Sequence, residues 1–337
     1  MTDELIIGGH RVASGELTRL RIPVARRYTA TDTYLPVWIQ RGKKPGPCLF
    51  VSAAVHGDEI NGVEIIRRLV ASRSVQRLRG TLIAVPIVNV YGFLQQRRYL
   101  PDNRDLNRSF PGSHSGSLAS RLARTFMDEV VSHATHGIDL HSGANHRANL
   151  PQIRASLNSE ETLRLSRAFG APVIVDAPLR EGSLREAVQE RNIPLLVYEA
   201  GEALRFDELG VRAGVRGILN VMRALEMLSP RQQVRASEPY VARSSTWVRA
   251  PESGIINVRC RLGQAVKEGD RLATISDPLG EEHVDVLCPV QGVIIGMIRL
   301  PLANEGDALF HIASFQEVAQ VAAEVAAFNR EFDPMFD

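Results

Sequence analysis

The sequence predicts an α/β protein, in which a mixed, mostly parallel sheet with helices on both faces is followed by a small all-β domain. From about residue 35 to residue 228, strand-like apolar runs alternate with segments whose apolar residues recur at helical spacing. The stretch Ser229–Thr246 is polar and broken by prolines, and the sequence after it is strand-like and punctuated by glycines. We therefore expect an α/β domain at 1–232, a linker at 233–246, a β domain at 247–313 and a C-terminal helix at 314–337.

The elements of the α/β domain follow from this alternation. The strands expected in chain order are Leu35–Gln40, Cys48–Ala54, Thr81–Val85, Ile138–Leu140, Pro172–Val175 and Pro194–Glu199. The helices expected between and after them are Gly62–Ala71, Leu118–Val131, Glu160–Phe169, Ser183–Arg191 and Asp207–Leu228. In open sheets of this kind, functional residues lie in loops beyond the carboxyl ends of the strands.

The predicted β domain contains an internal repeat. Ala250–Ile275 and Cys288–Ile312 both run Pro-x-x-Gly, then alternating aliphatics, then Gly-Asp-x-Leu and an isoleucine. Two such copies predict a small quasi-symmetric β-barrel, and they resemble the barrel-sandwich fold of biotinyl and lipoyl carrier domains. The connection between the copies, SDPLGEEHVDV, has no lysine, and Lys267 lies inside the first copy. We therefore expect the carrier shape without the carrier function.

The bulk composition limits the classes of partner. Of 337 residues, 44% are hydrophobic and 23% charged, and the formal net charge is +2. Such a near-neutral globular composition gives no reason to expect nucleic acid or an anionic membrane as a partner. The first residues lack the apolar segment of a signal peptide, so a cytoplasmic protein is expected. Three widely spaced cysteines, Cys48, Cys260 and Cys288, argue against a disulfide framework and a thiolate zinc site.

A histidine and a glutamate follow the second expected strand. His56 and Glu59 are three residues apart at a strand-to-helix turn, where both can point at one ion. Gly57 between them allows a tight turn of the backbone. Alone this H-x-x-E pattern is weak, and a simple cap of the following helix is the more common role of such a glutamate.

A second strand end supplies another histidine. The short apolar strand around Ile138–Leu140 runs directly into His141, which is where a distant metal ligand is expected. Asp139 lies two residues earlier, on the same face of an extended strand, and could accept a hydrogen bond from the ligand imidazole. His146 is an alternative ligand, in the less constrained segment ANHRAN.

A third strand ends in a carboxylate. Glu199 closes the apolar run Pro194–Tyr198, and a carboxylate there is costly unless it has a partner or a chemical role. Beside a metal-activated water it would act as a general base, with Glu202 as the substitute. Between the ligand motifs, residues 97–112 carry arginines and amides suited to binding a carboxylate, although a charged surface loop would look similar.

The motifs HGDE, DLNRSFPG, DLHSG and LVYEAGE occur in this order across about residues 35–230. Together with the lead-in GKKPGPCLFVSAAVHGDE and the trailing β domain, they resemble the succinylglutamate desuccinylase/aspartoacylase family, a branch of the zinc carboxypeptidase superfamily. Within it, the chain is most similar to the N-acetyl-diaminobutyrate deacetylase-like group. The resemblance implies a zinc-carboxypeptidase-like fold with one Zn²⁺ per subunit.

Site residues follow from the resemblance position by position. It makes His56, Glu59 and His141 the zinc ligands, and Glu199 the general base. Asn107 and Arg108 match residues that bind the substrate carboxylate. Arg98 matches the arginine that polarises the scissile carbonyl, with Arg104 as the competitor for that role. The family has an arginine just upstream of the strand that ends in the general base, and it has no clean counterpart here because Arg185 and Arg191 both lie near that position. A tyrosine that the second domain supplies in aspartoacylase cannot be placed in this sequence.

The expected activity is therefore zinc-dependent hydrolysis of the amide bond of a small N-acyl amino acid. The first alternative is a zinc carboxypeptidase that acts on short peptides with the same residues. The second is a non-enzymatic binding protein on the same scaffold, which predicts a missing ligand or base, whereas all four positions are filled. The acyl group, the amino acid and any homo-oligomer are left open by the sequence.

Overall fold

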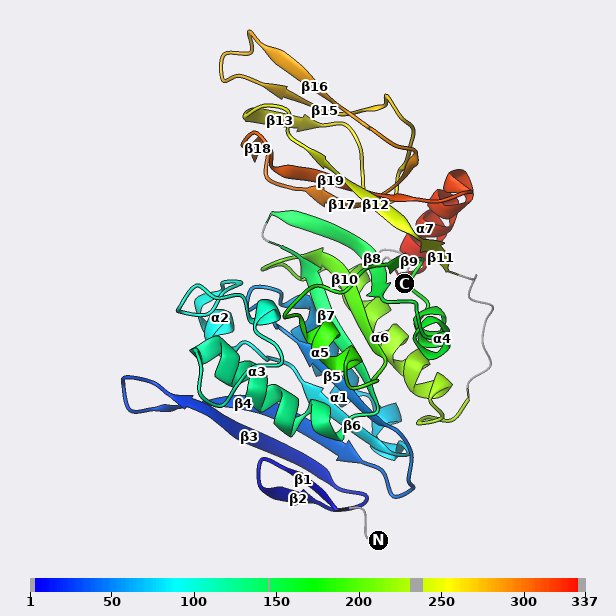
Figure 1. Ribbon diagram of the computed structural model, residues 1–337. Helices are drawn as coiled ribbons and strands as arrows, with labels where there is room; N and C mark the ends of the chain where they lie inside the picture. The colour runs from blue at the N-terminus through cyan, green and yellow to red at the C-terminus, as the bar shows by residue number, and fades with distance from the viewer. Residues whose placement is uncertain (1–3, 145, 231–238, 333–337) are drawn as a thin grey trace.

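The computed structural model describes residues 4–144, 146–230 and 239–332. It comprises an α/β domain, residues 4–230, and a β domain built from the strands after residue 243 (Figure 1). The strands of the α/β domain are β1 (Leu5–Ile7), β2 (His10–Val12), β3 (Leu17–Arg26), β4 (Asp32–Arg41), β5 (Cys48–Ala53), β6 (Thr81–Val85), β7 (His136–Gly143), β8 (Arg147–Ala155), β9 (Val173–Asp176) and β10 (Leu195–Glu202). Its helices are α1 (Asn61–Ala71), α2 (Val90–Gln95), α3 (Leu118–Glu129), α4 (Glu160–Phe169), α5 (Leu184–Gln189) and α6 (Glu208–Ala224), with 3₁₀ turns at Arg73–Arg77, Leu106–Arg108 and Val131–His133.

Side-chain caps explain why several helices begin where the sequence predicts. In each case an oxygen of the residue before the helix accepts a hydrogen bond from a backbone N–H in the first turn. The capping residues are Ser117 for α3, Ser159 for α4, Ser183 for α5 and Asp207 for α6. These caps fix the starts of four of the five predicted helices to within one residue.

The large sheet has 13 strands, contributed by both domains, and it is mixed. Its main path is β12-β19-β17-β8-β10-β7-β5-β6-β4-β3, in which β12 (Ser244–Arg249), β17 (Gly292–Ile298) and β19 (Ala308–Ser314) come from the β domain. The strands β6, β5, β7 and β10 at its centre are parallel, as are the pairs of β9 with β8 and β11, but β4 and β8 join this centre antiparallel. Within the α/β domain the pairings are therefore mixed and mostly parallel, as expected. The pairings that the β-domain strands β12, β19, β17 and β14 (Ala265–Val266) add to the sheet are antiparallel.

Helices cover both faces of the sheet, as predicted (Figure 1). Alternation along β5 shows the two layers: Leu49 and Val51 belong to the core shared with α1, α4 and α6, while Phe50 belongs to the core shared with α3 and α5. Phe50 meets Phe126 of α3 edge to face, with ring centroids 5.9 Å apart. The central strands β5, β6 and β7 are thus buried on both sides.

The β domain does not form the closed barrel that the repeat predicts. Its strands are β12 (Ser244–Arg249), β13 (Gly254–Val258), β14 (Ala265–Val266), β15 (Arg271–Ser276), β16 (His283–Leu287), β17 (Gly292–Ile298), β18 (Leu302–Ala303) and β19 (Ala308–Ser314). Within the described residues, β16-β15-β13-β18 form a separate antiparallel sheet, whereas β12, β19 and β17 extend the large sheet through pairing of β17 with β8. Each half of the repeat therefore contributes to both sheets around one apolar core.

The expected linker is only partly described. Residues 231–238 lie outside the described residues, but β11 (Tyr240–Ala242) and the start of β12 fall within the stretch 233–246. β11 pairs parallel with β9 of the α/β domain. The chain thus returns to the first domain's sheet before it enters the second domain.

The last helix, α7 (Val318–Phe332), packs on both domains. Val318, Val321 and Val325 pack with apolar residues of β9 and β17, while Phe328 and Phe332 pack on α6. No helix among the described residues is long and apolar enough to cross a membrane.

Candidate metal centre and active site

The loop from β5 to α1 carries two of the predicted metal ligands. It begins at the buried Ala54, whose φ of 50° is a left-handed conformation that non-glycine residues rarely adopt. Gly57 is required here because of close approach: a Cβ atom built on it would lie 2.0 Å from the backbone carbon of Gly92 in α2. From the sequence, Gly57 is expected for a tight turn of the backbone, whereas the structure shows that the close approach of α2 requires a glycine here. Packing against α2 therefore fixes the path of the chain between His56 and Glu59.

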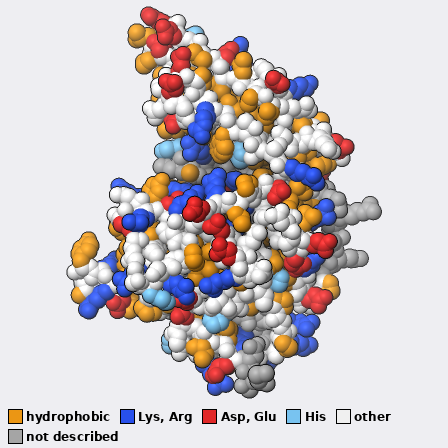
Figure 2. Space-filling model, in the orientation of Figure 1, with side chains coloured by type: hydrophobic (Ala, Val, Ile, Leu, Met, Phe, Trp, Pro, Cys, Tyr) orange, Lys and Arg blue, Asp and Glu red, His pale blue; other side chains and the backbone are white. Residues whose placement is uncertain are grey.

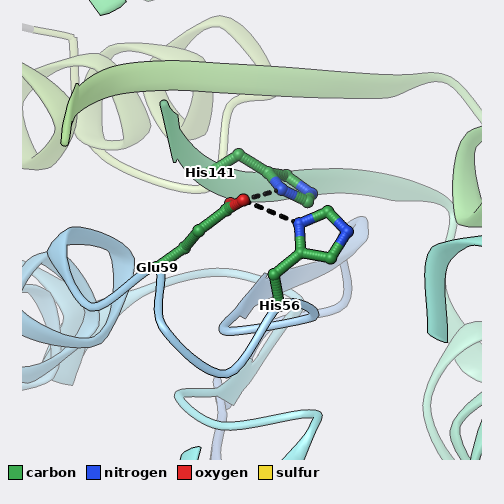
Figure 3. Close-up of side chains that lie close together, drawn as sticks. All are labelled: His56, Glu59 and His141. Atoms are coloured by element: carbon green, nitrogen blue, oxygen red, sulfur yellow. Dashed lines mark hydrogen bonds and ion pairs between the residues drawn. The ribbon is translucent and has the colours of Figure 1, made fainter. Parts of the chain in front are cut away.

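His56, Glu59 and His141 come together as predicted, and all three are buried (Figure 3). One carboxylate oxygen of Glu59 lies 2.7 Å from Nδ1 of His56, and the other lies 2.7 Å from Nδ1 of His141. We call these three residues the metal cluster. Both imidazoles thus present the same nitrogen to one point beside the carboxylate.

The opposite nitrogen of each imidazole has its own carboxylate partner. Nε2 of His141 lies 2.7 Å from Asp139, as predicted, and Asp139 also accepts a hydrogen bond of 2.7 Å from Ser52 Oγ. Nε2 of His56 lies 3.2 Å from Asp105. A carboxylate on Nε2 keeps the proton at that nitrogen and leaves the Nδ1 lone pair available to a cation.

The charges of the metal cluster and its carboxylate partners shift one another's pKa values. Burial alone would lower the pKa of His141, but the charges of Asp139 and Glu59 raise it well above the ordinary value. The pKa of His56 is likewise raised, by Glu59 and Asp105 acting against burial. Burial would raise the pKa of Glu59, yet the two imidazoles hold it below its usual range. The carboxylates around the two imidazoles thus favour a positive charge there. A metal cation that binds Nδ1 of His56 and His141 can supply this charge in place of the protons.

The donor set fits a divalent metal ion. Two imidazole nitrogens and one carboxylate are the ligands of several mononuclear hydrolytic zinc sites, which keep a further position open. The ligand atoms of the three residues all lie within 4.8 Å of one another. His146, the alternative ligand, is exposed and not part of this cluster.

Glu199 lies next to the metal cluster on the neighbouring strand. In the parallel pairing of β10 with β7, Glu199 is directly opposite His141, so their side chains project from the same face. One oxygen of Glu199 accepts a hydrogen bond of 2.9 Å from Asn149 Nδ2 on β8. The carboxylate of Glu202, the alternative base, instead lies 3.9 Å from Nε of Arg205, and Glu202 does not line the cavity described next.

A cavity of about 220 Å³, here called the central cavity, contains the metal cluster and Glu199. Arg98, Asn107 and Arg108 also line it. Arg104 does not: its exposed side chain pairs with Asp102 at 3.4 Å, because the turn that contains it points toward solvent. The structure therefore brings Arg98, and not Arg104, to the metal cluster.

Arg98 is held by two carboxylates. Its Nε and Nη2 lie 3.3 and 3.0 Å from Asp105, and its Nη1 lies 3.4 Å from Glu59. These contacts use three of the five N–H groups of the guanidinium, so one N–H on each terminal nitrogen stays available. Burial would lower the pKa of Arg98, but the charges of Glu59 and Asp105 raise it, so the side chain is a permanent cation.

Several residues in or next to the cavity are not predicted from the sequence. Asp105 and Asn149 act through contacts between segments far apart in the chain, for which no local pattern exists. Trp247 of β12 also lines the cavity, stacked on His311 with ring centroids 4.3 Å apart. No tyrosine of the second domain is on the cavity wall among the described residues, and Trp247 is the aromatic residue that the β domain supplies.

Comparisons with known proteins agree with this geometry. The N-α-acetyl-L-2,4-diaminobutyric acid deacetylase of Halomonas elongata is 27% identical over 315 residues, which cover 88% of this chain and 91% of that protein. The structure of a succinylglutamate desuccinylase/aspartoacylase from Rhodobacter sphaeroides is 25% identical, with a TM-score of 0.79, over 89% of this chain and 94% of that one.

A product-bound structure of the ectoine utilization protein from Ruegeria pomeroyi shares the fold. It is 24% identical, with a TM-score of 0.81, over 89% of this chain and 95% of that one. The family model described as the succinylglutamate desuccinylase/aspartoacylase catalytic domain matches residues 45–225, which is more than half of the chain and includes every residue of the metal cluster together with Glu199. The chain therefore belongs to the succinylglutamate desuccinylase/aspartoacylase family.

Proposed function

We propose that the protein is a zinc-dependent amidohydrolase that removes the acyl group from a small N-acylated amino acid. The observation that carries the proposal is the metal cluster with Glu199 directly opposite His141. Members of this family are deacylases of N-acyl amino acids, and a curated relative removes an acetyl group from diaminobutyrate. One Zn²⁺ per subunit, held by His56, Glu59 and His141, would polarise the scissile carbonyl and lower the pKa of water.

The side chains around the metal cluster suit the two proton transfers of amide hydrolysis. Glu199 takes a proton from the attacking water and returns it to the leaving nitrogen. Asn149 holds one oxygen of Glu199, which leaves the other free to face the water. The two free N–H groups of Arg98 donate to the carbonyl oxygen as negative charge develops on it.

Asn107 and Arg108 would bind the carboxylate of the amino acid, since both line the cavity. Oδ1 of Asn107 accepts a hydrogen bond of 2.9 Å from the backbone N–H of Leu184, so its Nδ2 hydrogens are oriented as donors. Arg108 lines the same cavity, and its Nη1 donates to the backbone carbonyl of Asn107. An amide and a guanidinium together recognise a carboxylate by charge-assisted hydrogen bonds.

Comparison of two glutamate variants tests the proposed base. In zinc-loaded protein, Glu199→Gln should lower kcat by roughly 10²- to 10⁴-fold, because proton transfer is lost. The matched control is Glu202→Gln on the same strand, which should keep activity within about twofold because Glu202 does not line the cavity. Both variants should retain one zinc per chain by elemental analysis, since neither residue belongs to the metal cluster.

The substrate screen should include N-acetyl and N-succinyl amino acids and short peptides with a free C-terminus. Faster release from N-acyl amino acids than from peptides supports the proposal, and the reverse favours a carboxypeptidase. If zinc-loaded protein hydrolyses none of them, or if Glu199→Gln matches the wild type, the proposal is wrong.

A further inference from the structure

A second cavity, of about 250 Å³, lies further along β10 from the central cavity. Alternate residues of this strand project from one face of the sheet. Glu199 and Val197 line the central cavity, and Leu195 lines the second one. The rest of its wall comes from the segment after β8, the first turn of α4, α5 and the segment before β10. We call it the side cavity. No residue of the metal cluster lines it, so the proposed function does not account for it.

Four polar side chains on this wall have no partner in the described part of the chain. Those of Ser156, Asn158, Gln189 and Asn192 make no hydrogen bond or ion pair there. A hydroxyl and a primary amide can each donate and accept hydrogen bonds. Apolar residues 193–195 lie on the same wall. The side cavity can therefore hydrogen-bond a polar ligand at several points and contact its carbon atoms.

Arg185 is the charged residue of the side cavity, and no acidic residue among the described ones lines it. Nη2 of Arg185 donates to the backbone carbonyl of Pro178, whereas its Nη1 is buried and has no partner in the described structure. A buried N–H group that lacks a hydrogen bond costs free energy. Rotation of the half-buried side chain toward the side cavity would bring Nη1 to an acceptor there. The wall thus offers one unsatisfied cation and no anion.

Arg185 also belongs to the wall of the central cavity, so its side chain lies between the two cavities. Lys and Arg side chains gather where the α/β domain meets the β domain (Figure 2). Burial, followed by the charges of Arg154 and Arg180, lowers the pKa of Arg185 to about 10, so the group is still a cation at neutral pH. Glu199 and Asp176 act in the opposite direction, but within the described residues neither forms an ion pair with Arg185. Repulsion from its neighbours thus favours an anion beside Arg185.

The helix α5 does not supply that anion itself. Gln189 lies four residues after Arg185, where helical side chains are neighbours, and it lines the same cavity. A glutamate at this position would form an ion pair with the guanidinium, but glutamine is neutral. Glu186, the residue after Arg185, instead accepts a hydrogen bond from the backbone N–H of Gly182. The place of a counter-charge is therefore open to an anion from solution.

We propose that the side cavity binds a small hydroxylated carboxylate as an effector, at a site distinct from the metal cluster. The carboxylate pairs with Arg185, and the hydroxyl groups bond to the free hydroxyl and amide groups of the wall. An anion there neutralises a charge that also lines the central cavity, so it weakens the binding of an anionic substrate. Such coupling between two sites is reciprocal and typically changes affinity by about fivefold or more.

Glycerate and its uncharged amide, glyceramide, are the probes of this site. In calorimetric titration of zinc-loaded protein, we expect glycerate to bind at least about tenfold more tightly than glyceramide. The reason is that a hydrogen bond to an ionised group is roughly twice as strong as one between neutral groups. Equal affinities, or no binding of either probe, would overturn the proposal.

Two variants separate the side cavity from the central one. Gln189→Glu places a carboxylate beside Arg185, so it should weaken glycerate binding by about tenfold or more and raise the melting temperature. Asn107→Ala, in the central cavity, should leave the glycerate affinity within about twofold. The control Gln320→Glu makes the same change at an exposed site on α7 and should alter neither quantity. Binding that is lost in Asn107→Ala and kept in Gln189→Glu would place glycerate in the central cavity and refute the proposed site.

Steady-state kinetics test the coupling on a substrate that the protein hydrolyses. Glycerate should raise KM of the wild type by about fivefold, to a plateau, and leave kcat within about twofold, because an effect from a second site saturates. In Gln189→Glu, KM should no longer respond to glycerate. An unchanged KM in the wild type, or a rise without a plateau in both proteins, overturns the coupling. Failure of the proposed function is separate: if nothing is hydrolysed, the titrations still decide whether the side cavity binds the anion.

Discussion

The substitution Asp139→Asn removes the negative charge behind His141 and leaves the size of the side chain unchanged. In the wild type, both carboxylate oxygens are used: one accepts from Nε2 of His141 and the other from Ser52 Oγ, each at 2.7 Å. Asparagine can keep its oxygen toward His141 and turn its NH₂ toward the hydroxyl of Ser52, which also accepts. The hydrogen bonds survive, and only the charge that makes His141 a basic ligand is lost.

The expected loss of zinc affinity follows from the removal of this charge. Changes to a carboxylate that orients a metal-bound histidine typically weaken metal binding by about 10- to 100-fold, which corresponds to about 1.4–2.8 kcal/mol. Asp139 is only 1% exposed, so solvent does not replace the lost charge, and we expect the upper part of this range. The measurement is zinc affinity by competition with a chromophoric chelator, with thermal unfolding recorded on the same samples.

Ser52→Ala is the matched control. It removes the other partner of Asp139 but leaves the carboxylate facing His141, so zinc affinity should change by less than about threefold while stability falls by about 1 kcal/mol. Zinc binding by Asp139→Asn that equals the wild type would refute the view that Asp139 tunes His141 as a metal ligand. So would an equal loss of affinity in both variants.

Other parts of the cavity and its supports give further expectations. Asn149→Ala should lower kcat by about tenfold with little change in KM, because it frees Glu199 to rotate; an unchanged kcat would contradict its positioning role. Trp247→Ala should reduce kcat/KM by about tenfold, through loss of an aromatic wall worth about 1.4 kcal/mol, and a change below twofold would show that this residue does not meet substrate. Burial lowers the pKa of His311 in the folded protein to about 3, below the unfolded value of about 6.5. Its contribution to the free energy of unfolding is therefore complete above pH 6.5, and it is lost as the pH falls toward 3 because the unfolded chain takes up the proton first. Chemical denaturation at pH 5.5 should show about 1.4 kcal/mol less stability from this residue than at pH 8, and His311→Gln should remove that part of the difference. Gly57→Ala should cost about 3 kcal/mol in chemical denaturation, because its Cβ would overlap the backbone of Gly92, and a cost below 1 kcal/mol would contradict this packing.

The metal cluster could be predicted from sequence because its signals are local. His56 follows β5 and His141 lies near the carboxyl end of β7, and neighbouring parallel strands bring such ends to one edge of the sheet. Asp139 could be predicted as well, since two residues along a strand share a face. Glu199 is predicted from the apolar run that it follows, although β10 does not end there and continues to Glu202.

The other residues of the site, and the form of the β domain, depend on contacts between distant segments that no local sequence pattern indicates. The strand β8 was missed because Pro151 interrupts its pattern, and without it neither Asn149 nor Arg154 could be placed beside Glu199. The repeat in the β domain was recognised, but pairing of β17 with β8, which opens the expected barrel, is set by the neighbouring domain. Asp105 was not singled out because its partner His56 is 49 residues away.

The pairing of β8 with β17 has a consequence for how the protein moves. On one edge β8 is hydrogen-bonded to β10, which carries Glu199, and on the other to Gly296–Ile298 of the β domain. A hinge between the domains would have to break these backbone hydrogen bonds and expose two strand edges. Access to the cavity would therefore require local motion of the loops around it, and we expect heat to melt both domains in one cooperative transition.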